Sequence, residues 1–530
     1  MISAINIDKK KIITICTVIL FIFACFIRIF YISQKVGIHI DEGYTHVISN
    51  FNEYQWEKKF DTHKIYTGKE LKNLTFKNNT NIKEALQDVI KLRKNNDNDT
   101  CHCTLYNSIY LLWTQGKSPI SPQTFIYKGC GLNLLFFILS FFVMYKILQK
   151  LFPNSYVIIP GLALAYLNTG SISNTLFIRP YQLQELAFVV LTYIFIINFQ
   201  KLKAKENIIN LKNGIFISLS LAFAILTGYF SLLYIGILGS ILLFVSFKNK
   251  QLKNLQFLIG CCICALIIVF AFYPGFLNGF TSMRAEEVTS KIETNPINFI
   301  FNFIFSLSVY IYIIKSYFIY TPLLILMVLA FYLKKEKFDK LQVLLVSFSI
   351  IYSFIVMNLA PYKVLRYIVP IFPIISIFLP MFINGTKNII KKILFILSIL
   401  LIIIYAICPY STVDYIRNNP NHYFSSKIEN INNTKYENYK FIQQPEVPVV
   451  IINNPEYSCC LNLIFNMPDN QKYEFIDSTD KIPDKYKHYF LLVESKNSNS
   501  KLKNFKLPKN YKSIDTFNIT RFQGYELVRE

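Results

Sequence analysis

Directly after Lys9-Lys10-Lys11 the chain carries IITICTVILFIFACFIRIFYI, residues 12–32. At about 1.5 Å per residue, a helix of this length crosses the roughly 30 Å hydrocarbon core of a bilayer. The run is longer than the core of a signal peptide, and no clear small-residue cleavage site follows it, so it predicts an uncleaved membrane anchor. The lysines in front of it place the N-terminus in the cytoplasm.

The composition extends this prediction to the whole chain. Of the 530 residues, 53% are apolar and only 16% are charged, whereas about a quarter of the residues of a soluble protein are charged. The 55 Lys and Arg exceed the 32 Asp and Glu, which gives a net charge of +23. Because the lysines cluster between apolar runs, they indicate the positive-inside rule and contact with anionic lipids rather than a nucleic-acid partner. We therefore expect an integral protein of the plasma (inner) membrane that binds no nucleic acid.

Apolar runs predict ten further spans, about eleven in all: 131–149, 155–172, 182–199, 213–227, 229–247, 254–273, 318–333, 341–359, 364–383 and 393–409. Five groups of lysines then fall on the cytoplasmic side, provided that residues 298–315 do not cross the membrane. The aromatic, partly amphipathic pattern of 298–315 favours a helix in the outer interface, and a twelfth span is the alternative. The sequence thus predicts a mainly α-helical bundle of eleven to thirteen spans.

Two large segments remain outside this bundle. Residues 33–130 form the first extracytoplasmic loop, with juxtamembrane helices, of a transmembrane domain at 1–409. Residues 410–530 predict a small extracytoplasmic α/β domain, because polar turns separate the β-like runs Val447–Ile452, Tyr473–Ile476, Tyr489–Val493 and Tyr525–Val528. Five cysteines face this oxidising side, and one or two disulfides among them are compatible with the sequence without a defined pairing: Cys101, Cys103, Cys130, Cys459 and Cys460.

Two adjacent acids, Asp41 and Glu42, follow the first span in Gly37-Ile38-His39-Ile40-Asp41-Glu42-Gly43-Tyr44. A carboxylate pair at the outer mouth of a helical bundle is a candidate general base or metal ligand, because burial and the neighbouring charge tune one of the acids. The alternative is a polar helix cap in the headgroup zone. The sequence contains no glycine-rich phosphate loop, HExxH motif or serine nucleophile elbow, which argues against nucleotide-driven or hydrolase chemistry.

Basic residues stand at two other outer mouths, Arg179 in Arg179-Pro180-Tyr181 and Lys363 with Arg366 in Pro361-Tyr362-Lys363-Val364-Leu365-Arg366-Tyr367. Two guanidinium groups on the same side as two carboxylates can bind a phosphate close to a base. The alternative for each arginine is an interface anchor that snorkels to the headgroups. We favour the anchor for Arg28, inside the first span, and the phosphate site for Arg179 and Arg366. Three polar residues, Gln182, Gln184 and Glu185, enter the next apolar helix, where such groups mostly face a cavity or a partner.

These residues, in this order, resemble the GT-C membrane glycosyltransferases, in the branch of the protein O-mannosyltransferases and the aminoarabinose transferases of lipid A. Asp41-Glu42 resembles the Asp-Glu pair of that branch, and Arg179-Pro180-Tyr181 its Arg-x-Tyr. The His-Pro-Pro-Leu-Tyr stretch corresponds to His102-Cys103-Thr104-Leu105-Tyr106, where both prolines are replaced. The usual Thr-His-Tyr-Phe turn corresponds to Thr227-Gly228-Tyr229-Phe230, and the Arg-Tyr with spaced prolines to Arg366-Tyr367, Pro370 and Pro373. The resemblance covers roughly residues 10–410.

The resemblance implies an inverting enzyme that moves a sugar from a polyprenyl-phosphate donor to a hydroxyl of a lipid, glycan or protein acceptor on the extracytoplasmic face. It makes Asp41 the general base and Glu42 either its orienting partner or a ligand of the acceptor, without a nucleotide cofactor, and it leaves metal dependence open. It assigns the donor phosphate to Arg179, Arg366 and Lys363, and further substrate contacts to Tyr181, His102, Tyr106, Tyr229 and Tyr367. The alternatives are a multispan lipid or solute transporter or flippase, which the absence of an internal repeat disfavours, and a polysaccharide polymerase or ligase.

Overall fold

The computed structural model describes residues 9–35, 38–50, 59–74, 81–96, 104–115, 121–281, 286–287, 289, 296–333, 338–360, 362–407, 439–452, 457–477, 485–494, 507–519 and 522–530. The chain divides into two compact units, which we describe separately. The helical unit comprises residues 1–34, 100–106 and 130–416, and the sheet unit comprises 35–99, 107–129 and 417–530. This division differs from the expected boundary at 409/410, because most of the first loop belongs with the C-terminal segment rather than with the spans.

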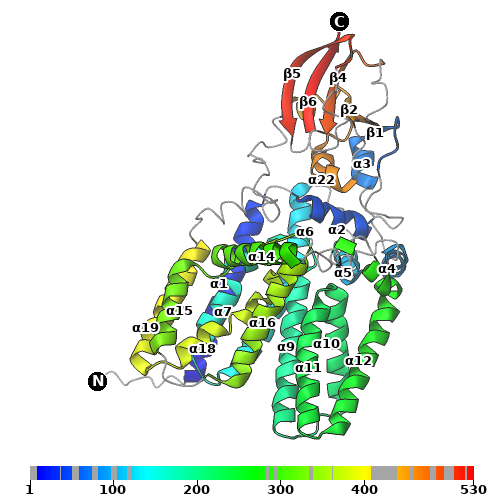
Figure 1. Ribbon diagram of the computed structural model, residues 1–530. Coiled ribbons are helices and arrows are strands. Elements are labelled where there is room, and N and C mark those ends of the chain that lie inside the picture. The colour runs from blue at the N-terminus through cyan, green and yellow to red at the C-terminus, as the bar shows by residue number, and fades with distance from the viewer. Residues whose placement is uncertain are drawn as a thin grey trace. The chain divides into compact units, whose positions relative to one another are not determined.

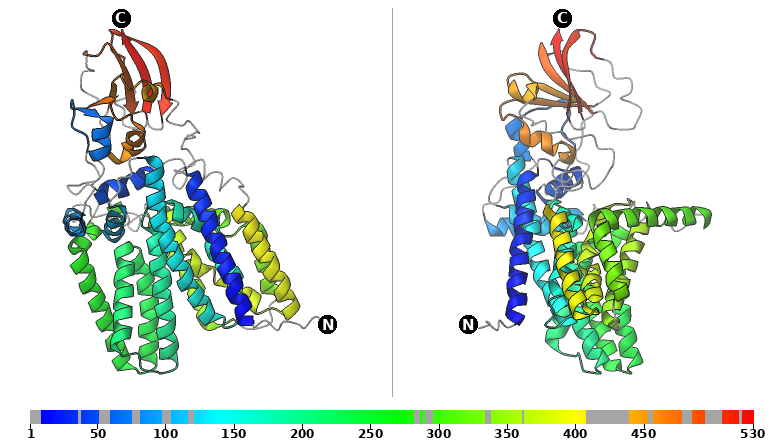
Figure 2. Two further views of the ribbon diagram at one scale, coloured as in Figure 1. Left: turned by 180° about the vertical axis from the view of Figure 1, so that it is seen from behind. Right: turned by 90° about the vertical axis from the view of Figure 1, so that its left-hand side faces the viewer.

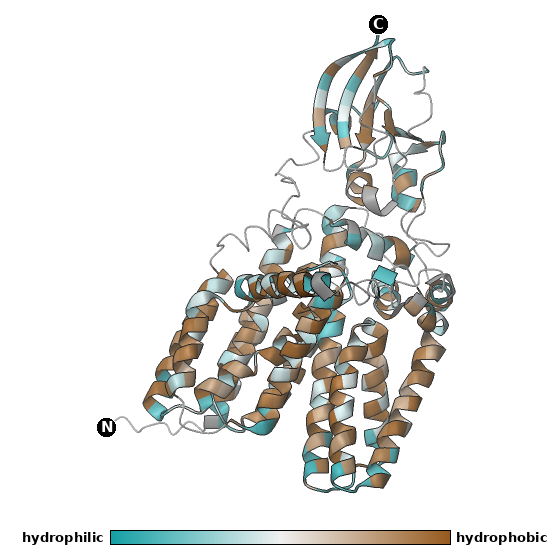
Figure 3. Cartoon of the chain, in the orientation of Figure 1, coloured by the Kyte–Doolittle hydropathy of each residue, from teal (hydrophilic) through white to brown (hydrophobic). Residues whose placement is uncertain are grey.

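Long apolar helices form most of the helical unit, and their hydrophobic middles give way to hydrophilic ends (Figures 1 and 3). In chain order the helices of this unit, long and short, begin with α1 (Lys9–Gln34), α6 (Pro122–Leu151), α7 (Ile158–Tyr166), α8 (Thr169–Leu176), α9 (Tyr181–Lys203), α10 (Leu211–Thr227), α11 (Ser231–Lys248) and α12 (Leu252–Phe272). They continue with η1 (Pro274–Thr281), α14 (Pro296–Tyr317), α15 (Thr321–Leu333), α16 (Lys340–Leu359), η2 (Leu365–Tyr367), η3 (Val369–Ile371), α17 (Phe372–Ile375), α18 (Phe378–Asn384) and α19 (Asn388–Ile407). The predicted polytopic α-helical bundle is confirmed.

The individual spans agree with the sequence in part. Among the described residues, eight helices are long and apolar enough to cross a membrane, and seven of them coincide with predicted spans. The predicted span 155–172 is instead two helices, since Asn168 ends α7 and caps α8 by accepting a hydrogen bond from the amide of Ser171 at 2.8 Å. The predicted span 364–383 is broken into η2, η3, α17 and α18, because Pro370 and Pro373 lack the amide hydrogen that a continuous helix needs.

The eighth long apolar helix is α14, which covers the segment expected to lie in the interface. Figure 2 shows α14 running across the direction of the other helices of its unit. Most of its large side chains are exposed, including Ile300, Phe301, Ile304 and Phe305, and it packs on α16, where Tyr310 and Ser353 share a hydrogen bond of 2.8 Å. This direction agrees with an interfacial helix, whereas its length and composition also allow a span, so the interfacial position of 298–315 stays a prediction.

The sheet unit is built on a six-stranded sheet with the order β1-β3-β2-β4-β6-β5. Its strands are β1 (Ile65–Thr67), β2 (Val449–Ile452), β3 (Lys472–Ile476), β4 (His488–Glu494), β5 (Tyr511–Ile519) and β6 (Phe522–Arg529). The central strand β2 runs parallel to β3 and β4, and the remaining pairs are antiparallel. All four predicted strands are present, and the sequence analysis missed β5 and β1. The first loop thus supplies an edge strand to the C-terminal sheet.

Short helices connect the first loop to this sheet. They are α2 (Ile40–Asn50), α3 (Gly68–Leu74), α4 (Ile82–Asn96), α5 (Thr104–Thr114), α21 (Lys440–Gln443) and α22 (Tyr457–Asn466). One core of the unit joins Val47 of α2 to α22 and to one face of the sheet. A smaller cluster joins Ile48 of α2, Leu92 of α4 and Leu111 of α5. As a result, α2 is packed on two sides within its own unit.

Candidate functional site

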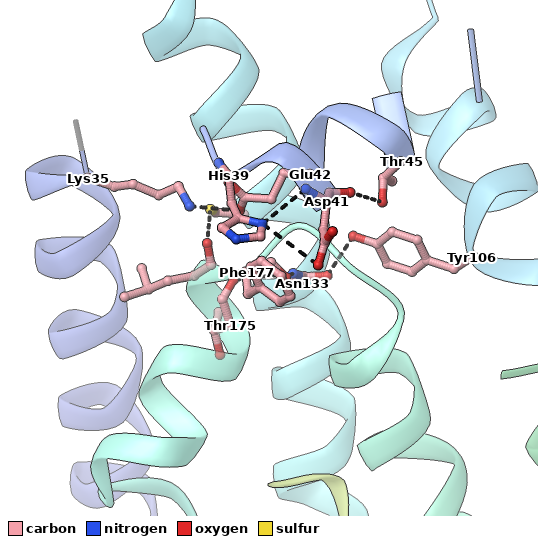
Figure 4. Close-up of polar contacts among 11 residues, drawn as sticks. Lys35, His39, Asp41, Glu42, Thr45, Tyr106, Asn133, Thr175 and Phe177 are labelled. Carbon is pink, nitrogen blue, oxygen red and sulfur yellow. Dashed lines mark hydrogen bonds and ion pairs between the residues drawn. The ribbon is translucent and has the colours of Figure 1, made fainter. Parts of the chain in front are cut away.

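The acid pair lies at the first turn of α2, where His39 precedes the helix (Figure 4). The Glu42 carboxylate accepts a hydrogen bond from the His39 amide at 2.7 Å. This is the bond that the third residue of a helix makes to the N-cap amide in a capping box. The Asp41 amide donates to Nδ1 of His39 at 3.0 Å. Because Nδ1 accepts this bond, the neutral His39 ring carries its proton on Nε2.

The two adjacent acids have different surroundings. The Glu42 side chain is completely buried and forms an ion pair with the Lys35 ammonium at 2.7 Å. The Asp41 side chain is 18% exposed, and its carboxylate lies 3.8 Å from Nδ1 of His39. The Asp41 side chain is therefore partly open to solvent, whereas the oxygens of Glu42 are engaged within the protein.

Aromatic contacts within the sheet unit fix the position of α2. The buried ring of His46, on α2, lies edge to face against Phe125 of α6 and Phe465 of α22, with centroid separations of 5.3 and 6.0 Å. Its Nδ1 is 3.4 Å from the hydroxyl of Tyr110 on α5. The helix that carries Asp41 is thus anchored to the C-terminal part of the chain as well as to the first loop.

In the helical unit, Arg179 lies in the short connection between α8 and α9. Its amide donates to the carbonyl of Phe177 at 2.7 Å, and Asn133 of α6 donates to the carbonyls of Thr175 and Phe177 at 3.3 and 2.6 Å. The Asn133 side-chain oxygen accepts a 3.0 Å hydrogen bond from Tyr106 (Figure 4). Tyr106 is only 1% exposed, so this contact orients the connection, and its predicted substrate contact stays a prediction.

Three of the motifs singled out in the sequence meet through aromatic rings. Tyr367 packs edge to face against Tyr181 and Phe230, with centroid separations of 6.1 and 5.8 Å, and Tyr181 stacks parallel to Phe177 at 6.1 Å. The Arg366 guanidinium lies 5.1 Å from the centre of the Tyr367 ring. The motifs at 179–181, 227–230 and 366–367 therefore share one cluster of side chains, which we call the aromatic cluster: Phe177, Tyr181, Phe230 and Tyr367.

Two other predicted residues have strong contacts within the protein. The Lys363 ammonium donates to the carbonyls of Met357 and Asn358 and so caps the C-terminal end of α16. The Tyr229 hydroxyl donates to the carbonyl of Phe276 in η1 at 3.0 Å. A Cβ atom on Gly279 would lie 2.0 Å from that hydroxyl, so only glycine allows the tyrosine to approach η1 this closely.

The position of Arg28 differs from the expected interface anchor. Its side chain is completely buried and binds Ser171 and Thr175 of α8 rather than reaching the headgroups. Glu185 of α9 is also buried and accepts hydrogen bonds from Ser140, Asn174 and Gln182. The polar residues at the start of α9 predicted that Glu185 faces a cavity or a partner. Only the structure shows which residues bind it. Asn133 was missed because a single asparagine in an apolar helix carries no pattern.

The predicted site residues are distributed between the two units. Asp41 and Glu42 belong to the sheet unit, whereas Tyr106, Arg179, Tyr181, Tyr229, Lys363, Arg366 and Tyr367 belong to the helical unit. His102, Cys101 and Cys103 lie outside the described residues, as does the side chain of Cys459. Cys130 and Cys460 are completely buried. Within the described part of the chain, no group of three or more His, Cys, Asp or Glu could hold a metal ion.

The comparisons with known proteins identify the fold. No protein-family model and no curated protein matches the sequence. The structure is similar to the crystal structure of ArnT, an aminoarabinose transferase, from Cupriavidus metallidurans bound to undecaprenyl phosphate. The two share 10% sequence identity with a TM-score of 0.53, over 96% of this chain and 97% of ArnT. The chain therefore has a fold similar to that of ArnT along nearly its whole length.

Proposed function

We propose that this protein is an integral membrane glycosyltransferase that moves a sugar from a polyprenyl-phosphate-linked donor to an acceptor hydroxyl on the extracytoplasmic face. The observation that carries the proposal is the contrast between the accessible carboxylate of Asp41 and the buried, ion-paired carboxylate of Glu42. A general base must reach its substrate, and only Asp41 of this pair does so. The similarity to ArnT, whose structure holds undecaprenyl phosphate, supports the donor class.

In this mechanism Asp41 accepts the proton of the acceptor hydroxyl as its oxygen attacks the anomeric carbon. A positioned base of this kind contributes roughly 10²–10⁴-fold to the rate. Glu42 holds the first turn of α2 through the amide of His39 and the ammonium of Lys35, and so orients Asp41. No second carboxylate is assigned as a covalent nucleophile, so attack occurs opposite the leaving group and inverts the anomeric carbon.

The departing phosphate takes the electron pair of the broken anomeric bond. Arg179 and Arg366, assisted by Lys363, stabilise the negative charge that develops on this group, which is where fixed cations accelerate a reaction most. Tyr181 and Tyr367 orient the two arginines and contact the sugar together with Tyr229, Tyr106 and His102. Packing of Tyr181 against Tyr367 supports a shared role for the two motifs.

The remaining parts of the proposal concern location and partners. The N-terminus lies in the cytoplasm and the C-terminal sheet lies on the extracytoplasmic side, where the acceptor is a lipid or glycan of the cell envelope, or a protein. The many exposed apolar side chains of α1, α12 and α14 face lipid. Lipid access is what the isoprenoid tail of such a donor requires.

The substitution Asp41→Asn tests this function. It keeps the size of the side chain and removes its basicity, so we expect turnover to fall by about two to four orders of magnitude while purified protein still binds undecaprenyl phosphate. The matched control is Glu42→Gln at the adjacent position, which should reduce turnover less. Full turnover by Asp41→Asn would refute the assigned base.

The substrates can be identified in cells. Mass spectrometry of envelope glycans and polyprenyl-phosphate sugars in a deletion strain should show one missing sugar together with its accumulated donor. Transport of a lipid or solute by the purified wild-type protein, without transfer to any acceptor, would instead establish the transporter or flippase class. Loss of whole polymer chains, with the single sugars retained, would point to a polymerase or ligase.

A further inference from the structure

A continuous path of hydrogen bonds joins Arg28 of α1 to Glu185 of α9 inside the helical unit. Arg28 Nε donates to Thr175 Oγ1 at 3.0 Å, and Thr175 Oγ1 donates to Gln182 Oε1 at 2.9 Å. Gln182 Nε2 then donates to Glu185 Oε1 at 2.8 Å. Every bond has its donor on the side of the cation and its acceptor on the side of the anion, an arrangement in which successive bonds polarise one another.

Further contacts hold both ends of the path. The Arg28 guanidinium donates to Ser171 Oγ at 2.9 Å and to the carbonyl of Ala24 at 3.1 Å. It also lies 3.6 Å from the centre of the Phe137 ring, a cation–π contact. Glu185 accepts hydrogen bonds from Ser140 at 3.0 Å and Asn174 at 3.3 Å. Both charged side chains are completely buried.

Both charged side chains bind the same face of α8, the helix that precedes Arg179 in the chain. Ser171, Asn174 and Thr175 are three and four residues apart, which places them on one side of that helix. Arg28 binds the first and third of them, and Glu185 binds the second. The chain passes from α8 to Arg179 within three residues, so the contacts of Arg28 and Glu185 with α8 lie close along the chain to the connection that carries Arg179.

Stability alone gives little reason to keep two charges at this depth. Removing an ion from water costs several kcal/mol, and apolar side chains that replace a buried ionic network often leave a protein as stable or make it more stable. A directional network does specify one arrangement of the helices that share it. We propose that Arg28 and Glu185 are positioning residues for Arg179 and Tyr181, acting through α8. This inference rests on the proposed function for the role of Arg179.

A double-mutant cycle on the purified protein tests the inference through donor use. Arg28→Met should lower kcat/KM for the polyprenyl-phosphate donor by at least about fivefold, and Arg28→Lys should restore part of it. In an Arg179→Ala background, Arg28→Met should cause less than about a twofold further loss, because the residue through which it acts is already absent. Equal fold losses in both backgrounds would overturn the positioning role.

The matched control is Thr192→Val on the same helix as Glu185. It removes a buried hydrogen bond of 2.8 Å between Thr192 and Tyr234 without touching the path, and kcat/KM for the donor should stay within about twofold of wild type. Glu185→Gln tests the other end of the path. The neutral amide has only one oxygen to accept the three hydrogen bonds that the two carboxylate oxygens of Glu185 accept in wild type. It should resemble Arg28→Met and not Thr192→Val.

Hydrogen exchange provides a readout that does not need activity. In Arg28→Met and in Arg28→Lys, peptides that cover Phe177–Gln182 should exchange their amides faster than in wild type, while peptides of α10 and α11 should not. Unchanged exchange in Phe177–Gln182 would overturn the inference. The two proposals can also fail separately. If the Arg28 variants exchange faster at Phe177–Gln182 but the wild-type protein transfers no sugar, the positioning of the connection is upheld and the proposed function is refuted.

Discussion

Tyr181 and Tyr367 meet edge to face, with ring centroids 6.1 Å apart and planes at 84°. Tyr181 begins α9 two residues after Arg179, and Tyr367 follows Arg366 directly. A single aromatic contact therefore joins the two motifs that carry the candidate phosphate-binding arginines. Such aromatic pairs stabilise a structure by about 0.5–1.5 kcal/mol beyond the contribution of the surface area they bury. The contact therefore helps to hold the two short segments together.

The two arginines should behave as a pair toward the donor. We expect Arg179→Ala and Arg366→Ala each to lower kcat/KM for the polyprenyl-phosphate sugar by about tenfold or more, and lysine replacements to recover only part of it if phosphate is bound in a bidentate manner. Steady-state kinetics in nanodiscs measure the effect. Unchanged donor kinetics in both alanine variants would leave the arginines as interface anchors.

The buried amide of Asn133 gives a prediction about stability. Asn133→Ala removes the acceptor of the Tyr106 hydrogen bond and the donor to the carbonyls of Thr175 and Phe177, and each buried hydrogen bond contributes about 0.5–1.5 kcal/mol. We expect a lower melting temperature and weaker donor binding. The comparison is Tyr106→Phe, which removes one hydroxyl only. A loss of turnover in Tyr106→Phe at wild-type stability would favour direct substrate contact by Tyr106.

Cysteine labelling in a cysteine-free background tests the topology. Cysteines at Glu206 and Lys340, in exposed positions next to membrane helices, should react with an impermeant reagent only after the membrane is opened, and a cysteine at Lys512 should react in intact cells. Cysteines at Phe301 and Tyr312, near opposite ends of α14, should be labelled from the same side. Labelling of these two from opposite sides would make α14 a span.

An exposed charge cluster on the sheet predicts a pH dependence. The Lys440 ammonium, 2.9 Å from the Asp515 carboxylate, holds the pKa of Asp515 below its usual 3.8. Hydrogen bonds to Asp515 and Glu526 raise the pKa of Lys440 above 10.5. The contribution of Asp515 to stability is present above pH 3.8 and fades as the pH falls through the lower folded value. That of Lys440 is present below pH 10.5 and fades as the pH rises through the higher one.

Lys440→Gln should therefore lower the melting temperature at pH 7, and the difference from wild type should shrink as the pH is lowered below 3.8. Thermal unfolding followed by intrinsic fluorescence measures this difference. Lys512→Gln, at an exposed position on β5, is the control and should melt with the wild type at both pH values. A difference that persists undiminished in acid would exclude Asp515 as the partner.

The sequence predicted what depends on local pattern and missed what depends on partners far away in the chain. The apolar runs specified the bundle, and the β-branched and aromatic runs specified four strands. The alternation in β5 was present in the sequence but was interrupted by the shift in pairing between Ser513 and Asp515. The three residues of β1 carry no signal of their own, since their pairing with β3 is made by tertiary structure.

The same distinction applies to the candidate site. Ordered motifs identified Arg179, Tyr181, Arg366 and Tyr367, and the structure gathers the two tyrosines. The interpretation of Arg28 failed because snorkelling and burial look identical in one sequence: both place an arginine near the end of an apolar run. The decisive information, the hydroxyls of Ser171 and Thr175, lies on another helix.

The pairing of β1 with β3, and of α2 with α22, has a consequence for biogenesis. Ribosomes make β1 and α2 before nearly all of the membrane helices, whereas β3 and α22 follow the last of them. Domains fold as their parts emerge, so the helix that carries Asp41 can pack on α4 and α5 early but meets α22 only near the end of translation. A chain that stops after α19 contains α4 and α5 but lacks α22, the C-terminal partner of α2. The C-terminal segment thus completes the packing of α2 only after α19 has been made.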